Sequence, residues 1–279
     1  MNGLNHKRKE QVKMHLQCQG CFLDKAGGQS SQPVKLFACS GCHHAKYCSP
    51  ECQRAHWPIH KPLCKSRQQT QHRLEAQNAQ MAENLHSAAS SCSTSSSSKP
   101  LLPTELFEEL RAFSKQIRPL LGEMGFCAMD LVNNPDRWKD HFVLVKIARL
   151  FPVDAETPAW ARFVARDIEA IPNSQIDRLP HTASGMSFTE IFEQKKRQDQ
   201  YSASLGYIDS LTVMIQADAD QGSDLCRITI CNVVFVAFKS IPKSLVGDGN
   251  RPRRREVYLY MMNMMIEAVR RKTKKKNTK

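Results

Sequence analysis

The sequence predicts a small, irregular, cysteine-rich module followed by a larger α+β domain, and three observations predict this organisation. First, seven of the 11 cysteines lie between residues 18 and 64. Second, residues 65–100 are polar and become rich in serine, a composition typical of linkers. Third, residues 101–245 combine apolar residues at helical spacing with segments rich in Val, Ile and Phe. At 279 residues, the chain is long enough for one large domain or two small ones.

Positive charge is concentrated at the two ends of the chain. The net charge is +13, and residues 250–279 hold 11 Lys and Arg against two acidic residues. Because this charge attracts anions, we consider acidic partners such as nucleic acid or anionic protein surfaces. The longest apolar stretch, Ile230 to Phe238, is shorter than the ~20 residues that a membrane span needs. Residues 1–10 lack an apolar core, so no secretory signal is expected and the cysteines should stay reduced, as metal ligands.

Eight potential zinc ligands occur in four pairs. Both C-x-x-C pairs carry a glycine, Gly20 or Gly41, just before the second cysteine, where a tight turn needs a small residue. The other two pairs are separated by four residues, which places both ligands on one face of a helix. Ser49 and Pro50 suit the start of such a helix. Two tetrahedral sites are expected, and spacing alone allows sequential or interleaved filling. The pairs are Cys18 and Cys21, Cys39 and Cys42, Cys48 and Cys52, and His60 and Cys64.

This segment resembles the MYND-type zinc finger at every ligand position and at several neighbours, including Tyr47, Gln53, Trp57 and Lys61. The resemblance covers residues 18–64 and implies two structural Zn²⁺ ions, bound in an interleaved manner within an irregular fold of knuckles and short helices. The additional histidines His43, His44 and His56 are expected at the surface or behind the ligands. The implied sets are Cys18, Cys21, Cys48 and Cys52 for one zinc, and Cys39, Cys42, His60 and Cys64 for the other.

The resemblance also implies protein binding, because MYND fingers of several transcriptional co-regulators take extended Pro-x-Leu-x-Pro peptides. Ser40, Gln53 and Trp57 match the peptide-contacting positions of the family. The alternative is that Trp57 forms the small core of the finger, packed on Leu63 or Tyr47. DNA reading by the finger is not expected, because its helices should be cut by Pro58 and Pro62.

Further elements are expected downstream of the finger. A helix continues to about Leu85 within the predicted linker 65–100. Apolar residues from Leu106 to Ile117 predict an amphipathic helix that Pro119 should stop or kink, and Trp160 to Ile168 predict a second. Cys226 and Cys231 are expected to be core thiols. Strands are predicted at residues 142–150, 211–215 and 226–238. The predicted organisation is a basic N-terminal segment 1–17, the finger 18–64, the linker 65–100, the α+β domain 101–245 and a basic C-terminal helix and tail 246–279.

The sequence favours an interaction protein over an enzyme. The Asn-His-Ser and Gly-Glu-Glu motifs that a SET methyltransferase would need are absent. A MYND-linked lysine methyltransferase remains one alternative, and nucleic-acid binding through residues 251–279 is another. The basic clusters of this tail flank a methionine-rich helix, Val257 to Val269, which we expect to dock on the second domain. They also suit an import signal or a solvated tail, so the protein is expected in the nucleus or cytoplasm, with the nucleus favoured.

Overall fold

The computed structural model describes residues 18–21, 35–89, 100–178, 188–204, 206–220, 227–238 and 255–277. The chain divides into two units, with the boundary between Gln69 and Thr70. The first unit contains the short strands β1 (Phe37–Ala38) and β2 (Lys46–Tyr47), which pair antiparallel. Helix α2 (Pro50–Ala89) starts in the first unit and ends in the second. The helix therefore continues four residues past the expected Leu85.

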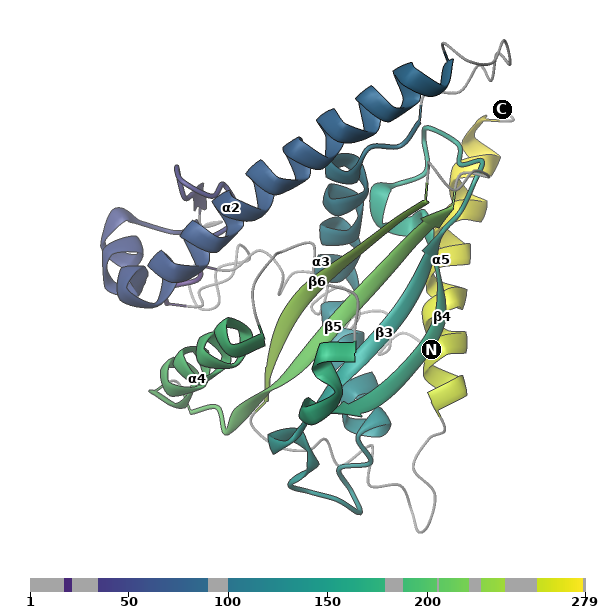
Figure 1. The fold of residues 1–279 in the computed structure, drawn as a ribbon. Helices are drawn as coiled ribbons and strands as arrows, with labels where there is room; N and C mark the ends of the chain where they lie inside the picture. Colours follow the sequence, from purple (N-terminus) through teal and green to yellow (C-terminus); the bar gives the residue numbers. More distant parts are fainter. Residues whose placement is uncertain are drawn as a thin grey trace. The chain divides into compact units, whose positions relative to one another are not determined.

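A four-stranded mixed sheet forms the centre of the second unit, in the order β4-β3-β5-β6 (Figure 1). The two central strands run parallel, and each edge strand pairs antiparallel with its neighbour. The strands are β3 (His141–Arg149), β4 (Phe163–Pro172), β5 (Asp209–Asp220) and β6 (Arg227–Phe238), and the helices are α3 (Pro103–Ala128), α4 (Phe188–Ser204) and α5 (Arg255–Asn277). Short 3-10 turns lie at Arg137–Lys139, Ala159–Ala161 and Asn173–Arg178. The expectation of an α+β domain is confirmed.

The core of the second unit lies between one face of the sheet and helices α3 and α5. Alternating residues of β3 and β5 are buried in this core, among them Val143, Val145, Val213 and Ile215. On the other face, Phe142, Leu144, Met214 and Cys231 form a smaller cluster with residues of α4 and the 173–178 turn. Burial, together with the charge of Asp218, raises the pKa of the Cys231 thiol to about 12, as fits a core thiol. Cys226 lies outside the described residues.

Helix α3 carries the predicted apolar stripe but is longer than predicted. Leu106, Leu110, Phe113 and Ile117 are almost completely buried. Of the two predicted effects of Pro119, a stop is wrong, because α3 continues to Ala128. Leu120, Leu121 and Met124 are buried in the same core beyond that point. Their burial offsets the one backbone hydrogen bond that a helical proline removes.

The predicted helix from Trp160 to Ile168 is wrong. A 3-10 turn covers Ala159–Ala161, and Phe163 to Pro172 form edge strand β4. The buried residues Phe163, Ala165 and Ile168 are spaced by two and three. This spacing arises because the β3–β4 register shifts between Lys146 and Ile147. A β-bulge thus gives a strand an apolar spacing that resembles a helix.

The methionine-rich C-terminal helix docks on the second unit as expected. Tyr258, Met262 and Ile266 of α5 are buried in the main core. The side chain of Asn263 accepts a hydrogen bond from the Ala165 N–H (2.8 Å) and donates one to the Ala165 carbonyl (3.0 Å). In the described part of the chain, no helix has both the length and the apolar character to cross a membrane.

Candidate metal centre and peptide groove

The helix that carries half of the metal ligands begins where the sequence predicts. The Ser49 hydroxyl accepts a hydrogen bond from the Cys52 N–H (3.3 Å), and Pro50 occupies the first helical position. The expectation that Pro58 and Pro62 cut the helix is wrong, because both lie inside α2. Each proline removes a backbone hydrogen bond, and ligands before, between and after them hold the helix in place.

The first donor set brings together ligands from two distant segments. Cys18 and Cys21 meet Cys48 and Cys52, with all four sulfurs within 4.8 Å of one another. The Cys21 and Cys48 sulfurs are 3.6 Å apart, and those of Cys48 and Cys52 are 3.4 Å apart. Tetrahedral zinc with Zn–S bonds of about 2.3 Å sets its sulfurs about 3.8 Å apart. The four donors therefore fit one zinc ion.

The second donor set is buried and equally compact. Its members are Cys39, Cys42, His60 and Cys64, again with ligand atoms within 4.8 Å. The Cys39 and Cys64 sulfurs are 3.9 Å apart, and the Cys42 sulfur is 3.6 Å from His60 Nε2. These are the separations expected around a tetrahedral zinc with one nitrogen ligand. The interleaved arrangement is confirmed, and four protein ligands at each site suit structural zinc.

The electrostatics of the donors favour a divalent cation. Burial opposes ionisation of Cys42, but hydrogen bonds with His60 and with the backbone of Ala45 and His44, together with the charge of Arg67, outweigh it and lower the pKa of Cys42 to about 5. Burial and the neighbouring Cys42 charge raise the pKa of Cys64 to about 12. The three crowded thiols of this donor set thus cannot all ionise without a compensating positive charge, because the thiolates repel one another. A Zn²⁺ ion supplies that charge and keeps its ligands deprotonated.

Both predicted turn glycines are required by close packing around the sulfurs. A Cβ at Gly20 would lie 2.6 Å from the Cys52 carbonyl oxygen. A Cβ at Gly41 would lie 2.9 Å from the Cys64 sulfur. The Gln68 amide also approaches that sulfur at 3.6 Å, as a donor that stabilises a thiolate. The glycines therefore allow the chain to close tightly around each ligand set.

None of the additional histidines belongs to the two donor sets. His56 is buried behind them and shares a hydrogen bond of 3.0 Å with the Tyr47 hydroxyl. Burial, with a smaller effect of His60, lowers the pKa of His56 to about 4, which keeps the ring neutral at pH 7. Tyr47 is 1% exposed and is the central aromatic residue of the finger core.

Trp57 lies at the surface of the finger, with 40% of its area exposed. Its ring lies 5.8 Å from the ring of His60, so the zinc ligand supports it from behind. Trp57, Gln53, Arg54 and Pro50 line a hollow of about 610 Å³ along one face of α2. We did not predict from the sequence that Pro50 and Arg54 line a hollow. Helical spacing could have shown it, because positions three, four and seven residues before Trp57 lie on the same face of a helix.

Gln53 and Ser40 occupy different places relative to this hollow. Gln53 lines it and also approaches the Cys39 sulfur, with its amide nitrogen 3.9 Å away. Ser40 directly follows Cys39 and is exposed, but it is not among the lining residues. The structure therefore brings Gln53 and Trp57 together and leaves Ser40 outside the hollow.

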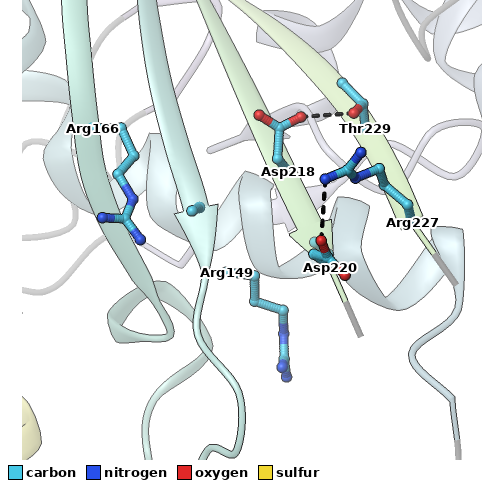
Figure 2. A pocket seen from close by; sticks show the side chains of 8 residues that line it. Arg149, Arg166, Asp218, Asp220, Arg227 and Thr229 are labelled. Atoms are coloured by element: carbon cyan, nitrogen blue, oxygen red, sulfur yellow. Dashed lines mark hydrogen bonds and ion pairs between the residues drawn. The ribbon is translucent and has the colours of Figure 1, made fainter. Parts of the chain in front are cut away.

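A second hollow of about 420 Å³ lies in the second unit, at one end of the sheet. Figure 2 shows Arg166 on one side of it and Asp218, Arg227 and Thr229 on the other. Its charges pair locally: Thr229 donates to Asp218 (2.6 Å), and Arg227 forms an ion pair with Asp220 (3.2 Å). Charged side chains of both signs therefore line this hollow.

The sequence comparisons assign the first unit. The family described as MYND finger matches residues 17–64, and with the two donor sets this identifies the segment as a MYND zinc finger. Such fingers mediate protein–protein interaction in general. No solved structure matches the chain.

The matched relatives share the finger alone. Residues of this chain are 46% identical over 48 positions to the Homo sapiens histone-lysine N-methyltransferase SMYD3. They are 43% identical over 47 positions to the N-lysine methyltransferases SMYD2 of Gallus gallus and SMYD2-A of Danio rerio. Each alignment covers 17% of this chain and 9% of the relative. The chain therefore spans about a tenth of the length of these relatives.

Proposed function

We propose that this protein is a non-catalytic adaptor whose MYND finger binds proline-rich segments of partner proteins, in the manner of a transcriptional co-regulator. The exposed Trp57 beside Gln53 is the observation that carries the proposal. A flat aromatic face suits the rings of an extended proline segment, and a neighbouring amide can satisfy its backbone. Such a segment loses little conformational entropy on binding, which favours a shallow site.

The similarity to named methyltransferases does not extend this proposal to catalysis. It ends with the finger, so it supports a shared binding module and leaves the second unit without an inferred chemistry. In this proposal the second unit is a folded domain that carries the finger.

Peptide titration of the full, zinc-loaded chain tests the proposed binding. The probe is a fluorescein-labelled Pro-x-Leu-x-Pro peptide followed by anisotropy, with a peptide whose prolines are replaced by alanine as control. Trp57→Ala should weaken binding about thirtyfold, as loss of an interface tryptophan costs about 2 kcal/mol. Phe37→Ala, which removes an aromatic residue of 51% exposure in the same unit, should leave the affinity unchanged.

Zinc content distinguishes a lost contact from a lost fold, and it should be two ions per chain in both variants. Absence of saturable binding, or equal weakening by both substitutions, would show that the finger does not use this face for proline-rich peptides.

We also propose that the protein enters the nucleus through its basic C-terminal clusters. Alanine replacement of Arg253 to Arg255 and of Lys274 to Lys276 should leave a fluorescently tagged protein in the cytoplasm. An unchanged nuclear signal would contradict the proposal.

A further inference from the structure

Helix α5 has two apolar faces, and only one of them packs into the core. Tyr258, Met262 and Ile266 follow one another at intervals of four residues and are buried. Val257, Tyr260 and Met264 are 41%, 65% and 50% exposed. They make up three of the eight large exposed hydrophobic residues in the described part of the chain. Exposed apolar residues that gather on one helix indicate an interaction site more strongly than scattered ones do.

The spacing of these exposed residues is that of a docking helix. With the half-buried Met261, they occupy positions i, i+3, i+4 and i+7, which form a single row along the helix. We call this row, Val257, Tyr260, Met261 and Met264, the outer stripe. Arg271 lies seven residues beyond Met264 and is 75% exposed on its side chain. The row thus leads from apolar to basic along one side of α5.

Charge indicates what kind of partner covers the outer stripe. Residues 250–279 hold 11 Lys and Arg and only two acidic residues. Glu267, one of these two, is already paired with Arg270 and Arg271 at 3.2 Å. A second copy of α5 would bring basic residues onto basic residues in either orientation, because both ends of the segment are basic. An acidic partner gains from the same charges.

The shape of the stripe favours a protein over a lipid surface. A helix that lies in a membrane immerses a broad apolar face, whereas the opposite face of α5 is already buried in the core. We propose that the outer stripe docks an acidic amphipathic helix of another protein.

Binding of a synthetic helix tests this proposal with the full, zinc-loaded chain. The probe is a fluorescein-labelled peptide with leucine at heptad positions a and d and glutamate elsewhere, and a scrambled peptide is the control. The double variant Tyr260→Ser and Met264→Ser should bind about tenfold more weakly than the parent chain. Ile208→Ser, at a residue of 61% exposure outside α5, should bind as the parent does. Raising the salt concentration should weaken binding.

Four results would overturn the proposal. They are absence of peptide binding, equal binding of the scrambled peptide, unchanged affinity of the double variant, and a concentration-dependent rise in mass that the double variant abolishes. Co-sedimentation with phosphatidylserine–phosphatidylcholine vesicles distinguishes membrane binding from protein binding. Vesicle binding that needs Tyr260 and Met264, without peptide binding, would assign the stripe to a membrane instead.

Discussion

Glu109 of α3 lies buried between two arginines that come from the strand region. Its carboxylate accepts from Arg149 Nε at 2.7 Å and from Arg162 Nη1 at 2.6 Å. The side chains of Glu109 and Arg149 are only 8% and 9% exposed. Arg149 also donates to the Leu150 carbonyl, and Arg162 to the Thr157 carbonyl. A single carboxylate thus joins α3 to the ends of β3 and β4.

Removal of this carboxylate charge should destabilise the protein, because it leaves two poorly hydrated guanidinium groups without their counter-charge. Glu109→Gln is expected to lower the free energy of unfolding by about 3 kcal/mol. Glu108→Gln is the matched control, because Glu108 is 60% exposed and pairs with Arg111 on the same helix. It should change stability by about 0.5 kcal/mol or less. Urea unfolding followed by circular dichroism measures both, and equal effects would refute the assignment.

Among the helices and strands, α5 and β4 are joined by core packing and also by one amide side chain, that of Asn263. β4 is an edge strand, so backbone groups on its outer side have no neighbouring strand to bond to, and Ala165 lies beside the bulge of this strand. Asn263 satisfies both backbone groups of Ala165, through its carbonyl and its amide nitrogen. Since Ala165 is 5% exposed, water cannot easily replace these bonds.

Asn263→Ala should therefore cost about 1–3 kcal/mol of stability, the penalty for leaving buried backbone groups unsatisfied. It should also speed hydrogen exchange at the Ala165 amide specifically. Asn133→Ala serves as control, because Asn133 bonds to Asp130 at the surface. If exchange at Ala165 is the same in both variants, the amide of Asn263 does not hold this strand.

At the scale of the whole molecule, the two units obtain their stability from different sources. The first unit has a core composed largely of its own metal ligands with Tyr47 and Ala45, whereas the second has an extensive apolar core. Zinc binding contributes on the order of 10 kcal/mol to folding in small finger peptides. The metal therefore replaces the apolar core that the finger lacks.

Chelation of zinc should unfold the finger and leave the second unit folded. Hydrogen exchange in excess chelator is expected to lose protection at Cys39, Tyr47 and Cys64. Strands β3 and β5, buried in the core of the second unit, should keep theirs. Added zinc should restore the lost protection. Persistent protection of the finger without metal, or simultaneous loss of the sheet, would contradict this division.

Prediction from the sequence succeeded where the chemistry is local. Ligand spacing identified all eight donors, and Ser49 and Pro50 identified the start of α2. It failed where distant partners decide the conformation. Pro58 and Pro62 lie inside a helix that metal ligands hold, and Phe163 to Ile168 form a strand because β3 pairs with them. Local propensity cannot register either influence, since both arise from residues far along the chain.

The metal chemistry and the α+β class follow from local sequence, because ligand type, spacing and hydrophobic periodicity are properties of neighbouring residues. The choice of the aromatic residue that is buried in the finger depends on how the folded chain packs. Tyr47 packs behind the ligands with His56, and Trp57 faces the solvent. The fold also decides that α5 carries an outer stripe, because Tyr260 and Met262 are both apolar in sequence and only packing distinguishes them. Exposure is a property of the assembled fold, and the proposed interactions of this protein depend on exposure.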